Sequence, residues 1–231
     1  MQDFGYIKEN LARVKEELLS AARKSGTAPA TLVAVTKSAT DEEFLALMRL
    51  GIADFGENRV QNYRRRMELL AAEGLTPRAH LIGSLQKNKV KYIADSVSLI
   101  QSLDSLSLAE EIEKQAAKKD RRIPVLIEIN SGREENKGGI LPEDALAFAR
   151  ELSRFPHLSP TGLMTMGPDY DEPEQYRGVF RETRGLLLTL QADGLFDTKT
   201  PTLSMGMSDS YAVAAAEGAT MVRVGRTLFH K

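Results

Sequence analysis

The sequence has 231 residues, a formal net charge of −1, 42% hydrophobic and 27% charged residues, and no cysteine. A near-neutral chain produces no global field that would draw it to nucleic acid or an anionic membrane, and a chain without cysteine has no disulfide, thiolate metal ligand or cysteine nucleophile. The segment Met1 to Asn10 lacks the apolar core of a signal peptide, and no apolar run approaches the ~20 residues that span a bilayer, so we expect a cytoplasmic protein.

The first predicted elements are an amphipathic helix and a short buried strand. Hydrophobic residues recur at spacings of three and four from Phe4 to Leu18, and Gly26 ends the helix. The strand Leu32–Thr36 is apolar and β-branched, and Lys37 follows it directly. A lysine in this position either reaches solvent, which is the commoner case, or is desolvated, which favours the neutral amine that attacks carbonyl groups.

Strands and helices then alternate along the rest of the chain. Further strands are expected at Ile52–Phe55, His80–Gly83, Ser98–Ser102, Pro124–Asn130, Thr161–Met166, Pro201–Ser204 and Thr220–Val224. Helices are expected between them at residues 41–50, 59–72, 86–94, 105–119, from Pro142 onward, at 174–192 and at 208–217. This alternation implies parallel strands with right-handed crossovers. Eight units without a linker favour a single-domain (β/α)8 TIM barrel over residues 1–231 rather than an open sheet, with the N-terminal helix packing in the outer ring.

In such a barrel the chemistry belongs at the carboxyl ends of the strands. The residues expected there are rich in hydrogen-bond donors and nearly free of carboxylates, which suits an anionic ligand. They include Lys37, Asn58, Ser84, Gln86, Asn130, Lys137, Ser204, Met205, Gly206, Ser208, Arg223, Gly225, Arg226 and Thr227. The loops 203–208 and 222–227 each carry a glycine. Either glycine alone indicates only a turn, but two such loops on adjacent strands predict a phosphate site, because exposed backbone N–H groups bind anions.

A reactive lysine beside a phosphate cradle is what pyridoxal 5′-phosphate (PLP) requires of a protein. In this hypothesis Lys37 bonds to the aldehyde of the cofactor, the two loops hold its phosphate, and Arg223 faces its ring nitrogen. An arginine stays protonated, so it would donate to an unprotonated nitrogen and leave the ring a poorer electron sink than an aspartate would. A structural salt bridge is the alternative role for Arg223.

Six segments resemble the pyridoxal phosphate homeostasis protein family (YggS/PROSC), whose fold is similar to the N-terminal barrel of alanine racemase. They are A-V-T-K at 34–37, F-G-E-N-R-V-Q at 55–61, H-L-I-G-S-L-Q-K-N-K at 80–89, N-K-G-G at 136–139, G-L-M-T-M at 162–166 and the run at 203–225. The resemblance implies that Lys37 is the Schiff-base lysine, that Asn58 lies near the cofactor and that Arg223 lies by the ring nitrogen. It places Ser204 and Gly225 at the phosphate, and the loop positions add Met205 and Arg226 as further candidates.

The resemblance also implies a function, which is to hold PLP and supply it within the cell as part of vitamin B6 homeostasis. In alanine racemase the second acid–base group comes from an additional β domain and a partner subunit, for which we expect no room in this chain. The expected partners are therefore PLP and apo PLP-dependent enzymes as recipients, with a monomer as the working unit and a weak dimer as the alternative. Two other functions stay open, a weak PLP-dependent amino-acid racemase or decarboxylase and a cofactor-free Schiff-base aldolase.

Two further patterns predict no site. His80, His157 and His230 are scattered along the sequence without the spacing of metal ligands, so no metal centre is expected. The basic clusters at residues 64–66 and 87–91 fall on predicted helices of a neutral chain, which favours solvated helix faces over a nucleic-acid interface.

Overall fold

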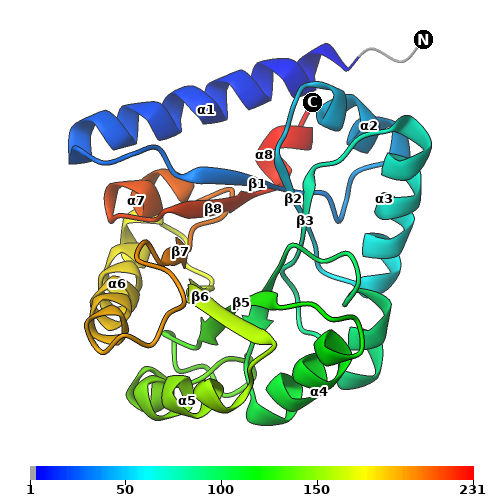
Figure 1. The fold of residues 1–231 in the computed structure, drawn as a ribbon. Coiled ribbons are helices and arrows are strands. Elements are labelled where there is room, and N and C mark those ends of the chain that lie inside the picture. The colour runs from blue at the N-terminus through cyan, green and yellow to red at the C-terminus, as the bar shows by residue number, and fades with distance from the viewer. Residues whose placement is uncertain (1–3) are drawn as a thin grey trace.

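The computed structural model describes residues 4–231, which form a closed barrel of eight parallel strands (Figure 1). Consecutive strands pair with each other, and β8 closes the barrel by pairing with β1. The strands are β1 (Thr31–Val35), β2 (Asp54–Glu57), β3 (Arg78–Leu81), β4 (Leu99–Leu103), β5 (Ile123–Ile129), β6 (Leu158–Thr165), β7 (Thr202–Ser204) and β8 (Met221–Val224). The predicted (β/α)8 fold is therefore confirmed. Residues 1–3, which begin the segment predicted to contain no signal peptide, lie outside the described residues.

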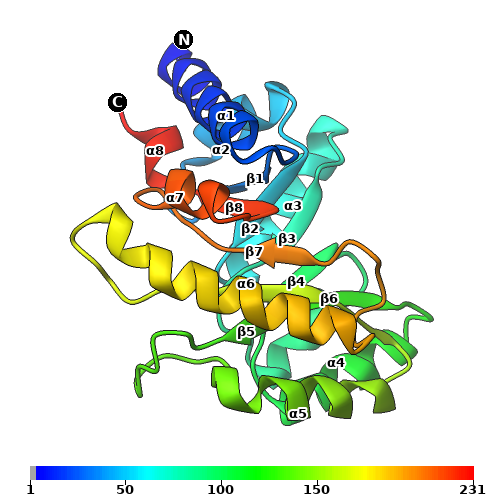
Figure 2. The same ribbon diagram turned by 90° about the vertical axis from the view of Figure 1, so that its left-hand side faces the viewer.

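Helices cover the outside of the barrel (Figures 1 and 2). The α-helices are α1 (Gly5–Ser25), α2 (Asp41–Arg49), α3 (Val60–Glu73), α4 (Leu106–Ala117), α5 (Ala145–Glu151), α6 (Arg177–Ala192), α7 (Tyr211–Ala216) and α8 (Arg226–Phe229). The short 3-10 helices are η1 (Lys87–Tyr92), η2 (Pro142–Asp144), η3 (Leu152–Arg154) and η4 (Pro173–Tyr176). Of the helices in this described part of the chain, none combines the length and apolar character needed to span a membrane.

Local side-chain chemistry decides where helices begin and end. Thr40 and Glu43 form a reciprocal capping box at the start of α2, and the hydroxyl of Ser105 accepts the N–H of Leu108 at the start of α4. Gly26 ends α1 in the left-handed conformation, as its position after the last hydrophobic repeat predicts. These boundaries are therefore set by residues that satisfy the free backbone groups of the first and last turns.

Two helical predictions were wrong in detail. Residues 86–94 were expected as one helix, but only residues 87–92 are helical, as the 3-10 helix η1, which buries a single side chain, Val90. Ile93 and Ala94 are also buried, but they lie in the turn after η1, where both of their N–H groups bond to the carbonyl oxygen of Val90. The helix expected from Ser208 begins instead at Tyr211, because the hydroxyl of Ser210 accepts the N–H of Met207 in a preceding turn.

The buried apolar side chains form two layers. The larger lies between the sheet and the surrounding helices, and the smaller fills the barrel with Val33, Leu99, Leu126, Met164 and Met221. The strands also bury an unusual number of polar side chains. They include Asp54, Glu57, His80, Gln101, Glu128, Thr165, Ser204 and Arg223, each no more than 6% exposed. Because buried polar groups are unfavourable without partners, this interior points to a function beyond packing.

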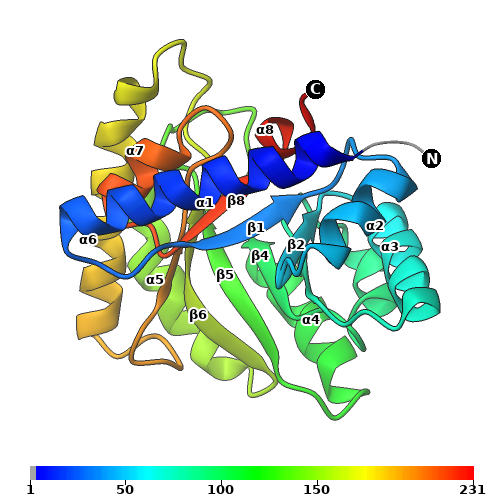
Figure 3. The ribbon, with the colours of Figure 1, turned by 90° about the horizontal axis from the view of Figure 1, so that it is seen from above.

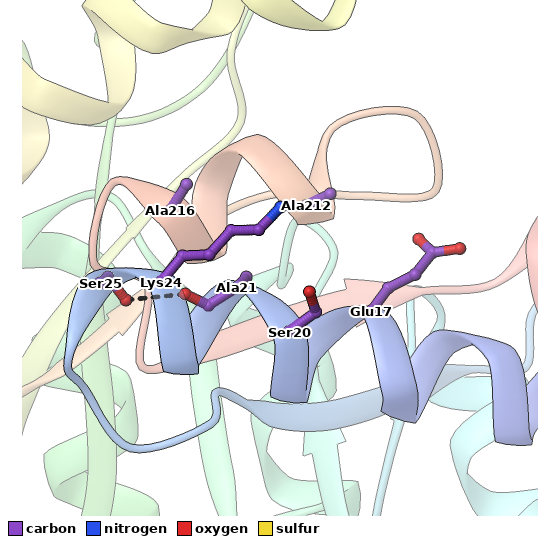
Figure 4. Close-up of a pocket in the computed structure, with 7 residues that line it drawn as sticks. All are labelled: Glu17, Ser20, Ala21, Lys24, Ser25, Ala212 and Ala216. Carbon is purple, nitrogen blue, oxygen red and sulfur yellow. Dashed lines mark hydrogen bonds between the residues drawn. The ribbon is translucent and has the colours of Figure 1, made fainter.

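Helix α1 lies along the seam where β1 and β8 meet, packed against α7 and α8 (Figures 2 and 3). The side-chain amide of Asn10 donates to the carbonyl oxygens of Leu228 and His230 at 3.3 and 2.7 Å, which joins the first helix to the last residues. Between α1 and α7 runs a groove of 370 Å³ with Lys24 reaching across it (Figure 4). Its lining is mostly small: Glu17, Ser20, Ala21, Lys24, Ser25, Ala212 and Ala216.

Candidate functional site

Lys37 follows β1 at the carboxyl end of the barrel, beside the end of β8. The strand register pairs Val33 with Arg223 and Ala34 with Val224, so the residues after these two strands emerge next to each other. Lys37 is exposed and lies in an open cleft of 370 Å³ between the loop after β1 and helix α3. Of the two alternatives for this lysine, the structure therefore shows the commoner one, because the side chain leaves the strand and reaches solvent.

A buried ion pair stabilises the turn that carries Lys37. Glu57, the last residue of β2, accepts a hydrogen bond from the Thr36 hydroxyl at 2.6 Å and one from Nε of Arg66 at 3.4 Å. The guanidinium of Arg66 also donates to the carbonyl oxygens of Thr36 and Ala39 at 3.2 and 2.6 Å. Burial raises the pKa of Glu57, and the bonds from Thr36 and Arg66 offset only part of that rise. The backbone is thus anchored on both sides of Lys37.

Arg223 lies on β8 with its guanidinium inside the barrel, and the residue is only 3% exposed. Nη1 donates to the carbonyl and hydroxyl oxygens of Ser204 at 2.9 and 2.8 Å, and Nη2 donates to the carbonyl oxygen of Thr165 at 2.9 Å. No carboxylate among residues 4–231 lies within the 4.0 Å of an ion pair, so the structural salt bridge is not formed. Burial lowers the pKa of Arg223 to about 10, against the opposing charge of Glu128.

Glu128 on β5 is the carboxylate that acts on Arg223 from a distance. It is 6% exposed, and burial raises its pKa to about 7. The like charge of Asp104 adds to this rise, and the positive charge of Arg223 opposes it. Between pH 4.5 and about 7 the folded protein therefore keeps a proton on Glu128 that the unfolded chain releases.

We expect the wild type to lose about 3 kcal/mol of unfolding free energy relative to Glu128→Gln between about pH 4 and about pH 8. A carboxyl group with a raised folded-state pKa stabilises the folded protein most below its unfolded value, and this contribution is lost as the pH rises through about 7. Urea unfolding of both proteins across the pH range measures the difference. Glu110→Gln, at an exposed position of α4, is the control, and its unfolding free energy should vary with pH as that of the wild type does. A pH-independent gap between wild type and Glu128→Gln would contradict the expectation.

The loops after β7 and β8 converge on the hydroxyl of Ser208. The backbone N–H groups of Gly225 and Thr227 point at its oxygen, at 3.3 and 3.4 Å. These distances are long for hydrogen bonds, so both N–H groups are weakly satisfied within the protein. A Cβ on Gly225 would lie 3.0 Å from the carbonyl oxygen of Val35, so the loop after β8 passes closely over the end of β1. Two backbone donors that follow β8 and a hydroxyl that follows β7 therefore lie together, and such a group of donors can bind an anion.

Three predicted site residues do not present their side chains in this cluster. The hydroxyl of Ser204 is buried inside the barrel, where it is bonded to Arg223. Met205 is fully buried in the apolar layer between the sheet and the helices. Arg226 is exposed and forms an ion pair with an aspartate of the loop after β7. Cofactor binding by these three residues stays a prediction, and the hydroxyl of Ser204 is bonded to Arg223 in this structure.

Asn58 lies at the rim, directly after β2, as predicted. It lines a cleft of 510 Å³ together with Ser84, Gln86 and Lys89. A Cβ on Gly83 would lie 2.6 Å from the carbonyl oxygen of Asn58, so only a glycine allows the loops after β2 and β3 to pack this closely. The sequence G-S after β3 thereby helps to set the position of Asn58.

Several residues at the site were not among the predicted cofactor-binding residues. Ser208 and Thr227 were expected at the rim but were not selected as ligands, although Ser208 ends the motif L-S-M-G-M-S at 203–208 that marks the loop after β7. The Glu57–Arg66 ion pair and the buried Gln101 had no such signal, because their contacts depend on how neighbouring strands are staggered in the barrel.

Comparison with known proteins identifies the family of this barrel. The family model of the alanine racemase N-terminal domain matches residues 7–230. A pyridoxal phosphate homeostasis protein from Aquifex aeolicus is 40% identical, over 96% of each chain. A solved structure of an unknown protein from Bifidobacterium adolescentis superposes with a TM-score of 0.92 at 31% identity, over 99% of this chain and 97% of that one. PipY from Synechococcus elongatus, solved with PLP bound, gives 0.83 at 29% identity, over 96% and 99%. The chain therefore belongs to the alanine racemase N-terminal domain family and, within it, to the pyridoxal phosphate homeostasis proteins.

Proposed function

We propose that the protein binds PLP reversibly, attaches it to Lys37 and takes part in the supply of this vitamin B6 cofactor in the cytoplasm. The observation that carries the proposal is the buried guanidinium of Arg223 on the strand next to Lys37. Its hydrogen bonds to the described part of the protein use three of its five N–H groups, and all go to uncharged oxygens. The name of the Aquifex aeolicus relative and the PLP in the PipY structure support the same ligand.

The residues at the rim fit this cofactor. When bound, PLP supplies an aldehyde carbon that reacts reversibly with a primary amine. Lys37 offers such an amine from an exposed position on an anchored turn. The N–H groups of Gly225 and Thr227, with the hydroxyl of Ser208, are donors for a phosphate. Arg223 has N–H groups left to donate to the ring nitrogen.

The same features favour a carrier over a catalyst. The open cleft at Lys37 lets a ligand enter and leave without the movement of a lid. Arg223 keeps its proton at neutral pH, since its pKa is about 10, so it binds the ring nitrogen without protonating it. We therefore propose that apo forms of PLP-dependent enzymes receive the cofactor, and that the barrel works as a monomer.

Mixing the purified protein with PLP is expected to give a yellow complex, in which borohydride fixes one cofactor on the peptide that contains Lys37. Lys37→Ala should lose this covalent product completely, because it lacks the amine, while its circular dichroism matches the wild type. Lys87→Ala, at an exposed lysine of η1, is the control and should behave as the wild type. Mass spectrometry of the reduced peptides gives the measurement, and an equal yield of product on another lysine would contradict the assignment.

Transfer to a recipient separates holding the cofactor from using it. We expect an apo PLP-dependent enzyme to gain activity when it is mixed with the loaded protein, while the yellow colour leaves the barrel. Steady racemisation or decarboxylation of a free amino acid would instead favour the enzymatic alternative. A wild type that stays colourless with PLP and cleaves a sugar phosphate would favour the aldolase.

A further inference from the structure

A chain of buried hydrogen bonds crosses the barrel from Arg223 to the opposite end of the strands. Nη1 of Arg223 lies 2.8 Å from the hydroxyl of Ser204, which lies 2.7 Å from Oε1 of Gln101. Nε2 of Gln101 lies 2.9 Å from Nδ1 of His80, and Nε2 of His80 lies 3.0 Å from Oδ1 of Asp54. None of these residues is more than 3% exposed. We call this set of five residues the barrel relay.

The chemistry of the groups fixes the direction of every bond in the barrel relay. The guanidinium of Arg223 can only donate, so the Ser204 oxygen accepts from it. A carbonyl oxygen can only accept, so Ser204 gives its own hydrogen to Gln101. The amide nitrogen of Gln101 then donates to Nδ1 of His80, which leaves the ring hydrogen on Nε2 to donate to Asp54. All four hydrogens point the same way, from a cation toward a carboxylate.

The carboxylate end of the barrel relay is fixed at the amino ends of the strands. Asp54 is the first residue of β2, and its two oxygens accept from Nε and Nη2 of Arg78 at 2.7 and 2.6 Å. Burial alone would raise the pKa of Asp54, but hydrogen bonds from His80 and Arg78 lower it overall. Asp54 is therefore ionised at neutral pH and acts as the final acceptor of the relay.

We propose that Gln101 and His80 are positioning residues that act through Ser204 to hold Arg223 toward the cofactor ring. This inference rests on the proposed function, in which Arg223 donates to the ring nitrogen. With Gln101 in place, the Ser204 hydrogen is directed away from Arg223, and the oxygen presents a lone pair to the guanidinium. Without that acceptor the hydroxyl is free to rotate its hydrogen toward the guanidinium. Arg223 then loses an acceptor and the orientation that the acceptor imposes.

The test compares variants of the full-length protein by their affinity for PLP and by the visible spectrum of the complex. Gln101→Leu and the smaller change Ser204→Ala each break the relay beside Arg223. We expect each to weaken PLP binding about tenfold, the effect of one lost hydrogen bond to a charged group. We also expect each to shift the absorbance maximum, since the ring nitrogen is held differently, while borohydride still fixes PLP on Lys37. Leu126→Val, a change of volume inside the barrel, is the control and should keep the wild-type spectrum.

A second measurement asks whether Gln101 acts through Arg223. In an Arg223→Gln background, Gln101→Leu should weaken binding no further, whereas independent effects would multiply. Multiplied effects, or a Gln101→Leu spectrum and affinity like those of Leu126→Val, would overturn the barrel relay and leave the proposed function intact. A wild type that binds no PLP would overturn the proposed function and this inference with it.

Discussion

Arg66→Met is expected to destabilise the folded protein by about 3–5 kcal/mol, the usual effect of removing one partner of a buried ion pair. The substitution leaves Glu57 fully buried without its cation and frees the carbonyl oxygens of Thr36 and Ala39. Urea unfolding followed by circular dichroism measures the loss. Because the same bonds anchor the turn of Lys37, the variant should also attach PLP to Lys37 more slowly at temperatures where it is folded.

The neighbouring residue provides a matched control for this prediction. Arg65 pairs with the same Asp41 as Arg66, but its side chain is 68% exposed, against 6% for Arg66. Arg65→Met should therefore lose less than ~1 kcal/mol. Adding Glu57→Gln to Arg66→Met should restore part of the lost stability, since it removes the unpaired buried charge. Equal losses for the two arginine variants would contradict the burial argument.

Gly162→Ala is expected to lower the unfolding free energy by about 4 kcal/mol or more, at the extreme of single substitutions. Gly162 on β6 pairs with Thr202 on β7 and has a φ of +152°. A Cβ at this position would lie 2.0 Å from the carbonyl oxygen of Thr202, so the two strands must separate. Strand β7 ends at Ser204, which holds Arg223, so PLP binding should weaken as well.

Gly185→Ala is the control for this substitution. Gly185 lies on the exposed face of α6, and a Cβ there meets nothing within 4 Å. Alanine should stabilise this helix by roughly 0.5–1 kcal/mol, because glycine is a poor helix former. The melting temperature should therefore fall for Gly162→Ala and rise for Gly185→Ala. A Gly162→Ala protein that melts within a few degrees of the wild type would show that β6 and β7 can separate enough to accommodate the added Cβ.

The order of strands was predictable because short segments rich in apolar residues alternate with helical segments and are bounded by turn residues. The direction of the polar side chains on these strands was not predictable. A strand buried on both faces shows no polar alternation, so the sequence around Ser204 does not say whether its hydroxyl faces the phosphate loop or the barrel interior. The exposure of Lys37 was equally hidden, since it depends on the turn held by Arg66, a residue from a different element.

Residues that stand in sequence motifs could be proposed for the site in advance. Contacts that depend on the register of the strands could not. Glycine in a turn is visible in the sequence, and Gly225 indeed brings an N–H group to the loop after β8. The contact between Gln101 and Ser204 joins strands that are far apart in the chain and lie on different sides of the barrel. The spacing of residues along the sequence cannot predict this contact, because the stagger of the strands in the closed sheet brings the two side chains together.

The closure of the barrel by β1 and β8 has a consequence for protein synthesis. Lys37 precedes strands β2 to β8 in the chain, and Arg223 with the N–H groups of Gly225 and Thr227 follows β7, although β1 and β8 are adjacent in the barrel. A chain that has been translated only through β7 contains the lysine but not the groups that we propose to hold its ligand. Helix α1 likewise gains its hydrogen bond to Leu228 only after β8 has been made. We therefore expect a chain that stops before β8 to bind PLP more weakly than a chain that includes this strand.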